Sequence, residues 1–286
     1  MFGAIIGDIA GSYYEMHNIK SKKFKFMEKN KSEFTDDTVM TLAVCKSLLE
    51  ANGNYNDLTQ IVINNMVAIG RNHSQCGFGG DFFKWIIKDE HKPYNSFGNG
   101  AAMRVSACGI VGKNIDEVKL ITKIVTEVSH NHPEAIKAAE SISTAIFLAK
   151  SGETKQEIKN YIKDNYYDIN FTLNEIRESY SFNVTCQGSV PQALEAFFES
   201  KSFEDAIRNA ISIGGDSDTI AAITGSIAGV YYGIPSKYIK KCEQFFISKY
   251  DIDLINIIND FEKKYPTKKI NPVNEILIKT FGKKGE

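Results

Sequence analysis

The chain has 286 residues, of which 43% are hydrophobic and 24% are charged. This composition is typical of a globular protein and excludes a disordered, collagen-like or coiled-coil chain. The 34 basic and 35 acidic residues leave a net charge of −1, so no general positive field would attract nucleic acid or an acidic membrane. The five cysteines form no CxxC pair and are odd in number, which favours a reducing cytoplasm.

The first sixteen residues combine a small-residue face with an acidic one. Gly3, Gly7 and Gly11 recur every four residues, so a helix here would have a bare face for close packing. Asp8 and Glu15 lie on another face of the same helix. Asp8 could bond to the start of a neighbouring helix, and Glu15 could be exposed or could face a metal ion. The segment lacks the basic stretch that begins a secretory signal.

A first acidic helix start lies at residues 35–38. Apolar residues at helical spacing predict a helix that ends near Gly53, which places Thr35, Asp36 and Asp37 at its N-terminus. Threonine and aspartate commonly cap helices, and negative charge at this end complements the helix dipole. Taken singly, these residues are explained by capping alone.

Helical periodicity dominates the rest of the chain. Further helices are predicted over 57–69, 117–129, 133–152, 154–166, 190–200, 202–215, 235–249 and 252–264. Asp116, Pro133 and Ser202 mark the starts of three of them. Alternation predicts strands only at 180–186 and briefly at 23–26, and residues 71–99 form the longest interruption. We expect one all-α domain over residues 1–286, with no membrane span, because the longest weakly polar stretch is too short.

A second acidic helix start lies at residues 214–219. Gly214 and Gly215 permit a tight turn, after which Asp216, Asp218 and Thr219 crowd the beginning of a helix. A cap needs one such oxygen, not three.

The two acidic helix starts together offer four carboxylates and two threonine hydroxyls, without a lysine or arginine in either. Packed like charges are costly unless a counter-charge lies between them. The all-oxygen donor set favours Mg²⁺ or Mn²⁺ over zinc, and six donors fit two ions better than one. Because 180 positions separate Asp36 from Asp216, the convergence of the two starts is a hypothesis.

Five segments form an ordered and highly specific set, although each alone is weak. They are GAIIGDIAGSYYE (3–15), FTDDT (34–38), SFGNGAAMR (96–104), SHNHPEAIKAA (129–139) and GGDSDTIAAITGSIAG (214–229). The set resembles the ADP-ribosylglycohydrolase family, which includes the dinitrogenase reductase-activating glycohydrolase. Residues 76–85 are similar to the bacterial branch of that family.

The resemblance implies a compact all-helical fold with a dinuclear Mg²⁺ or Mn²⁺ centre. By motif, the family's metal ligands fall on Thr35, Asp36, Asp37, Asp216, Asp218 and Thr219. Glu15 matches a glutamate near the scissile bond. Gly98, Asn99 and Gly100 match the loop that holds the diphosphate, and His130 matches a histidine that contacts the substrate.

Residue chemistry leaves simpler interpretations of these last positions open. The segment 98–100 could be a plain turn. His132 could cap the helix that begins at Pro133, with His130 structural. Arg104 could pair with phosphate or with a buried acid, and Asp81 could cap a short helix.

The activity implied by the resemblance is metal-dependent hydrolysis of the glycosidic bond between C1″ of ADP-ribose and an acceptor, such as ADP-ribosylated protein. Asp36 and Glu15 are the candidate acid–base residues, and the sequence does not choose between them. One alternative is a non-catalytic member that binds ADP-ribose; another is a dinuclear-metal phosphoester hydrolase, which would release AMP. The acceptor, whether arginine, serine, nucleobase or small molecule, is not specified. We expect a cytoplasmic monomer.

Overall fold

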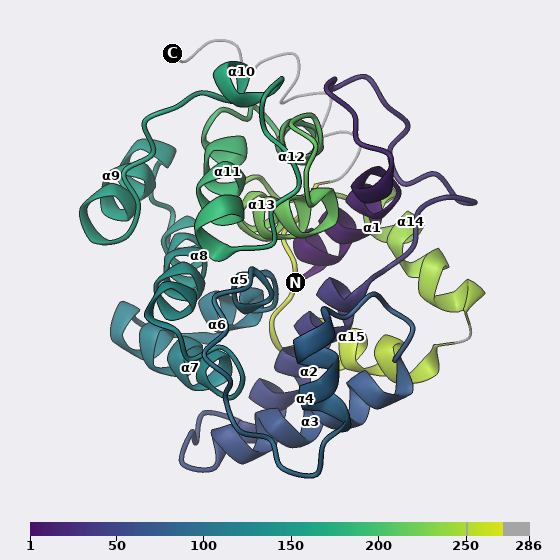
Figure 1. Cartoon of the computed structure of the whole chain (residues 1–286), viewed down its shortest axis with the longest axis vertical. Helices are drawn as coiled ribbons and strands as arrows, with labels where there is room; N and C mark the ends of the chain where they lie inside the picture. The colour runs from purple at the N-terminus through teal and green to yellow at the C-terminus, as the bar shows by residue number, and fades with distance from the viewer. Residues whose placement is uncertain (250, 271–286) are drawn as a thin grey trace.

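The described part of the chain is largely helical. The structure is a computed structural model that describes residues 1–249 and 251–270 (Figure 1). Its helices are α1 (Phe2–Met16), α2 (Asp36–Ala51), α3 (Leu58–Asn72), α4 (Gly80–Ile87), α5 (Gly100–Met103), α6 (Ser106–Val111), α7 (Ile115–Glu127), α8 (Pro133–Ser151), α9 (Lys155–Asn165), α10 (Leu173–Ile176), α11 (Cys186–Phe198), α12 (Phe203–Ile211), α13 (Ser217–Tyr232), α14 (Ser236–Ser248) and α15 (Ile252–Lys264). Two strands of two residues each, β1 (Ile234–Pro235) and β2 (Lys269–Ile270), pair in parallel. The predicted all-α class is confirmed.

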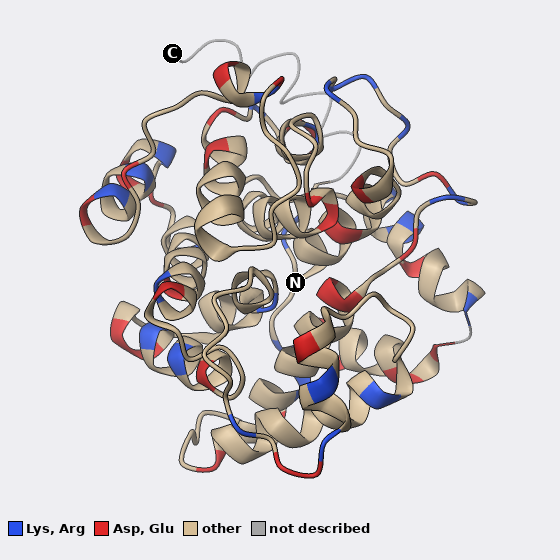
Figure 2. Cartoon of the chain, viewed as in Figure 1, with Lys and Arg blue, Asp and Glu red and all other residues tan. Residues whose placement is uncertain are grey.

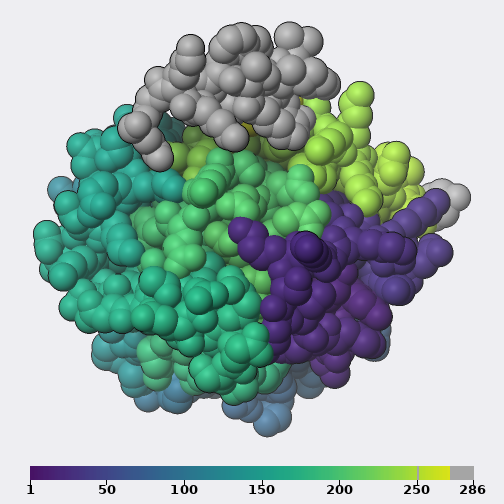
Figure 3. All heavy atoms as spheres, turned by 90° about the horizontal axis from the view of Figure 1, so that it is seen from above, coloured from purple at the N-terminus to yellow at the C-terminus, as the bar shows by residue number. Residues whose placement is uncertain are grey.

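The N-terminal helix α1 packs against α13, which lies far away in the sequence. At the surface, the N-terminal part of the chain (purple) likewise lies beside later residues (green) in Figure 3. The two backbones touch, because a Cβ added to Gly7 would lie 2.0 Å from the carbonyl oxygen of Ala221. One turn further along α1, a Cβ added to Gly11 would lie 2.4 Å from the carbonyl oxygen of Ser217. The predicted close approach of the glycine face is confirmed. Since the pairing runs antiparallel, the end of α1 lies beside the start of α13.

Asp8, in the middle of α1, fixes the place where α2 begins. Its buried carboxylate accepts hydrogen bonds from the backbone N–H and the hydroxyl of Thr35, both at 2.9 Å. It also accepts a bond from the N–H of Thr38 at 3.1 Å and one from that residue's hydroxyl. Asp8 therefore caps a neighbouring helix start, as the sequence suggests, and α1 holds the beginnings of both α2 and α13.

The α1–α13 pair is in direct contact with α2, α5, α6, α8, α11, α12 and α14, and the other helices pack outside these. Helix α8 packs against α6, α7 and α13, helices α11 and α12 cover α13, and α2 packs against α3 and α15 (Figure 1). Small buried residues of α8, such as Ala138 and Ala145, allow several neighbours to approach it. At Gly109 of α6 an added Cβ would lie 2.4 Å from the carbonyl oxygen of Ser143, so this crossing also depends on a missing side chain.

The predicted strands at 180–186 and 23–26 are wrong. The first segment is an extended loop whose one bridge joins Thr185 to Gly98, and the second forms no strand. The side chain of Asn183 accepts a hydrogen bond from the N–H of Thr185 at 2.9 Å. Backbone pairing is limited to this bridge, where the N–H of Asn99 donates to Val184 at 2.8 Å and that of Cys186 donates to Phe97 at 2.9 Å, so no ladder extends along the segment.

Two helices begin at other residues than predicted. Asn114 caps α7 by accepting a hydrogen bond from the N–H of Glu117 at 2.8 Å, whereas Asp116 lies within the first turn. Helix α11 starts earlier than the predicted range 190–200, because the hydroxyl of Thr185 caps it. Residues 71–99 are likewise not a continuous loop, since they contain α4.

The extent of the domain stays a prediction. The expected range 1–286 includes residues 250 and 271–286, which lie outside the described residues. No helix in the described ranges is long and apolar enough to cross a lipid bilayer.

Candidate metal centre and substrate cavity

The two acidic helix starts line one cavity of about 420 Å³. Figure 2, which has the same view as Figure 1, shows acidic segments of the ribbon near the middle of the molecule. The walls include Glu15 and the six predicted metal ligands, Thr35, Asp36, Asp37, Asp216, Asp218 and Thr219. Helices α1, α2 and α13 supply these residues or carry them at their ends, so the packing of these three helices builds this part of the cavity.

Direct contacts join the two helix starts. The hydroxyl of Thr219 donates a hydrogen bond to Oδ2 of Asp37, with 3.0 Å between the oxygens. Glu15, Asp216 and Asp218 each offer a carboxylate oxygen within 4.8 Å of the others, and this group could hold a metal ion. The structure thus brings the two starts together, as the sequence predicts, and places the half-buried Glu15 among the acids.

The chemistry of the donor set fits a hard divalent cation. Oδ1 of Asp37 and Oδ1 of Asp218 are buried and have no hydrogen-bond partner among the described residues. Burial, followed by the neighbouring acids, raises the pKa of Asp36 to about 8 and the pKa values of Asp37 and Asp218 well above their usual range. Carboxylates packed in this way stay ionised at neutral pH only with a positive charge among them, and oxygen ligands suit Mg²⁺ or Mn²⁺.

The turn before α13 depends on residues that follow α1. Gly214 and Gly215 have φ angles of 69° and 78°, a left-handed conformation that other residues rarely adopt. Asn18 accepts a hydrogen bond from the N–H of Gly215 at 2.5 Å, and the ammonium of Lys20 donates to the carbonyl of Ile213 at 2.6 Å. Neither polar residue can be recognised from the sequence, because nothing local shows that it meets a turn more than 190 positions away.

The glycine turn at 98–100 borders the acids in the same cavity. The N–H of Gly98 donates to the hydroxyl of Ser96 at 3.1 Å, and the N–H of Asn99 donates to the carbonyl of Val184 at 2.8 Å. The N–H of Gly100 has no hydrogen-bond partner in the described part of the chain. Of these three amides, that of Gly100 is therefore the one without a partner among the described residues.

The side chain of Asn99 connects this turn to the acids. Its amide nitrogen donates to Oδ2 of Asp216 at 2.7 Å and to the hydroxyl of Ser189 at 3.0 Å. Both amide hydrogens are thus engaged within the protein, which orients Asp216.

His130 lies buried beneath the glycine turn. Its Nδ1 is 2.8 Å from the hydroxyl oxygen of Ser129, and its Nε2 is 3.5 Å from the position that a Cβ on Gly100 would take. Burial, and then the nearby positive charge of Arg104, lower the pKa of His130 well below its usual range, so the ring is neutral. His132 instead caps α8 through its Nδ1, as one of the interpretations of the sequence proposes.

The rim of the cavity includes exposed residues, in contrast to the buried acids. Asp81 is exposed and pairs with Lys84, with 2.9 Å between the charged atoms. Phe182 and Val184 remain 56% and 51% exposed beside the opening. These two apolar residues are not predicted at the cavity, because the alternation of residues 180–186 resembles that of a strand.

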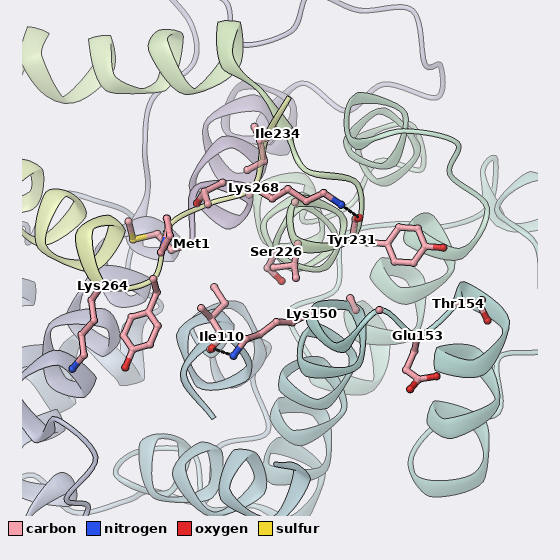
Figure 4. Close-up of a pocket in the computed structure, with 18 residues that line it drawn as sticks. Met1, Ile110, Lys150, Glu153, Thr154, Ser226, Tyr231, Ile234, Lys264 and Lys268 are labelled. Carbon is pink, nitrogen blue, oxygen red and sulfur yellow. Dashed lines mark hydrogen bonds between the residues drawn. The ribbon is translucent and has the colours of Figure 1, made fainter. Parts of the chain in front are cut away.

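A larger cavity of about 700 Å³ lies at the opposite end of α1 and α13 (Figure 4). The ammonium of Lys150 donates to the carbonyl of Ile110 at 2.6 Å, and that of Lys268 donates to the carbonyl of Tyr231 at 3.5 Å. These lysines complete the C-terminal ends of α6 and α13. Glu153 is the one acid among the described lining residues, so this cavity lacks the convergent carboxylates of the smaller one.

The chain belongs to the ADP-ribosylglycohydrolase family, since the family model of that description matches residues 1–269. It is 23% identical over 321 residues to human ADP-ribosylhydrolase ARH3, covering 85% of this chain and 88% of the relative. It is 27% identical over 227 residues to the ADP-ribosyl-[dinitrogen reductase] glycohydrolase of Rhodospirillum rubrum, covering 74% of each chain.

Two further similarities extend this result. A segment covering 50% of this chain is 25% identical to the ADP-ribosylarginine hydrolase Tri1 of Pseudomonas putida, of which it covers 42%. Among solved structures, a chain of an ADP-ribosylglycohydrolase-related protein complex superposes with a TM-score of 0.64 at 20% identity. The match covers 85% of this chain and 93% of the other. This structural similarity supports the helical fold.

Proposed function

We propose that this protein hydrolyses the glycosidic bond between C1″ of ADP-ribose and an acceptor, with two divalent cations, Mg²⁺ or Mn²⁺, as cofactors. Thr35, Asp36, Asp37, Asp216, Asp218 and Thr219 would hold the cations. The observation that carries this proposal is the meeting of both acidic helix starts in one cavity, where two carboxylate oxygens lack any described partner. Membership of the family supports the same reaction.

The reaction needs stabilisation of an oxocarbenium-like state and control of one proton. Divalent cations, when bound, would orient the ribose through its hydroxyls and lower the pKa of a water molecule. Asp36 and Glu15 are the candidate acid–base residues. Asp36 also belongs to the proposed ligand set, which would reduce its basicity, whereas Glu15 does not belong to that set. Burial, followed by the charges of Asp216 and Asp8, raises the pKa of Glu15, which helps it to keep a proton for transfer.

The diphosphate would lie against the glycine turn. The free amide of Gly100 can donate to a phosphate oxygen, and Gly98 leaves the backbone accessible. Asn99 would act in this subsite by holding the turn against Asp216. His130 would contact the substrate from beneath the same turn, a proposal that its distance of 3.5 Å from a Cβ built on Gly100 supports.

The proposed partner is an ADP-ribosylated protein or another ADP-ribosylated acceptor. The names of the relatives support this class: one acts on ADP-ribosylarginine and another on ADP-ribosylated dinitrogen reductase. All five cysteines are free in the structure, which supports a reducing, cytoplasmic location. A monomeric state stays a prediction.

The test is a product analysis with purified full-length protein. Protein treated with EDTA and then dialysed is incubated with peptides ADP-ribosylated on arginine or on serine, with an ADP-ribosylated nucleobase and with a small ADP-ribosyl conjugate. We expect free ADP-ribose from at least one acceptor, released only after Mg²⁺ or Mn²⁺ is restored. Release of AMP would instead identify a phosphoester hydrolase, and binding of ADP-ribose without product from any acceptor would identify a non-catalytic binder.

A further inference from the structure

Arg104 carries a buried positive charge that the protein only partly satisfies. Its side chain is fully buried, and burial lowers the pKa of the guanidinium to about 10, so it remains charged at neutral pH. Nη2 donates to the hydroxyl oxygen of Ser129 at 2.8 Å. Nε and Nη1 have no hydrogen-bond partner in the described ranges, and no described carboxylate forms an ion pair with the group. The face of Phe82 lies 5.3 Å from Cζ.

The hydroxyl of Ser129 connects the guanidinium of Arg104 to the imidazole of His130 by two hydrogen bonds. A guanidinium can only donate, so the hydroxyl oxygen of Ser129 accepts from Arg104. The hydroxyl's own hydrogen then has one acceptor among the described residues, Nδ1 of His130, at 2.8 Å. The opposite arrangement, with a hydrogen on Nδ1, would leave a fully buried hydroxyl hydrogen without an acceptor, which is costly.

The remaining hydrogen of the imidazole faces the glycine turn. Because the ring is neutral and Nδ1 accepts, its single N–H is at Nε2. Nε2 lies 3.6 Å and 3.5 Å from the positions that Cβ atoms on Gly98 and Gly100 would occupy. It forms no hydrogen bond with any residue that the structure describes. The donor therefore points at the space that only glycines keep open.

We propose that Arg104 and Ser129 are positioning residues that hold His130 as the Nε2–H tautomer, a ready donor to an anionic phosphate oxygen at the Gly98–Gly100 turn. The buried charge of Arg104, which borders the same cavity, adds a positive potential behind this donor. The choice of ligand rests on the proposed function; the tautomer itself does not.

The tautomer is measured by long-range ¹H–¹⁵N NMR of the imidazole side chains in the full-length protein without ligand. The chain has five histidines, and the signals of His130 are those absent from the His130→Asn variant. We expect Nε2 to be protonated and Nδ1 to be unprotonated. In Ser129→Ala both tautomers should be populated, while Ser106→Ala, which also removes a buried serine hydroxyl, should keep the wild-type pattern. Protonated Nδ1 in the wild type would overturn the inference.

Binding of ADP-ribose, followed by calorimetry, tests the donor role. The Kd should rise about tenfold in Ser129→Ala. In a His130→Ala background the Ser129→Ala change should add less than about twofold, because Ser129 acts through His130. An unchanged Kd in Ser129→Ala despite an altered tautomer would overturn the donor role. A wild-type protein with the expected tautomer that neither binds nor releases ADP-ribose would contradict the proposed function instead, and leave the tautomer assignment standing.

Discussion

Thr219 donates its hydroxyl hydrogen to Asp37 across 3.0 Å, although 182 positions separate the two residues. This bond joins the start of α13 to the start of α2 and occupies one oxygen of the Asp37 carboxylate. The other oxygen, Oδ1, has no hydrogen-bond partner among the described residues. The contact therefore both assembles the two acidic helix starts and leaves an oxygen available for a cation.

Replacing Asp218 by Asn should remove a ligand charge without a change of size. We expect loss of bound Mn²⁺, measured by elemental analysis, and a fall in turnover on the order of 100-fold or more. Asp81→Asn is the control, because Asp81 is exposed and paired with Lys84, and it should keep both metal and activity. A wild-type rate in EDTA for Asp218→Asn would refute the two-ion mechanism.

Glu15→Gln should separate proton transfer from metal binding. If Glu15 acts as the acid–base residue or orients water, turnover should fall roughly 100-fold while metal content stays at the wild-type level. Single-turnover rates and elemental analysis of the same preparation give the two readouts. Because Glu15 lies within 4.8 Å of Asp216 and Asp218, a parallel loss of metal would place it in the coordination shell instead.

The metal-free protein should lose stability as the pH rises. Burial and neighbouring acids raise the pKa of Asp36 to about 8 in the folded state, above the ordinary value of about 4 in the unfolded chain. Between these values the folded state binds more protons, so its unfolding free energy falls as the pH increases. Calorimetry in EDTA should show a Tm that decreases from about pH 5 to about pH 8, and Mn²⁺ should reduce this decrease. A Tm in EDTA that rises over this range would contradict the prediction.

Gly7→Ala should push α1 away from α13. The added methyl group would lie 2.0 Å from the carbonyl oxygen of Ala221, so one backbone has to move, and we expect a loss of about 3 kcal/mol in urea denaturation. Gly80→Ala is the matched control, because nothing lies within 4 Å of its added Cβ, and it should change stability by less than about 1 kcal/mol. Equal effects of the two substitutions would exclude the backbone contact as the cause.

Sequence reasoning succeeds where a local rule decides the structure. The predicted helix 252–264 coincides with α15, because its apolar spacing and its flanking residues agree. The bare glycine face of α1 and the capping role of Asp8 also follow from residue type and spacing. The helix start at Cys186 was missed, because Pro191 is typical of a first turn but lies within α11.

The candidate site shows where local rules stop. The acids could be chosen as a group because like charges need a counter-charge, wherever they lie in the chain. The roles of Asn99, Ser129 and Arg104 could not be predicted. A single polar residue takes its role from neighbours that only the fold brings together. Asn99 meets Asp216 across 117 positions, and no spacing rule reaches that far.

The contact between α1 and α13 also bears on the order in which the molecule folds during synthesis. Ile5 and Ile9 are fully buried in the finished protein, and the glycine side of their helix is covered by residues 217–229. In a growing polypeptide that ends before residue 217, α1 therefore lacks α13, against which it packs in the finished protein. The residues of α1, which are made before α13, therefore take their final place late, and a nascent chain that ends before Thr219 cannot bring the two acidic helix starts together.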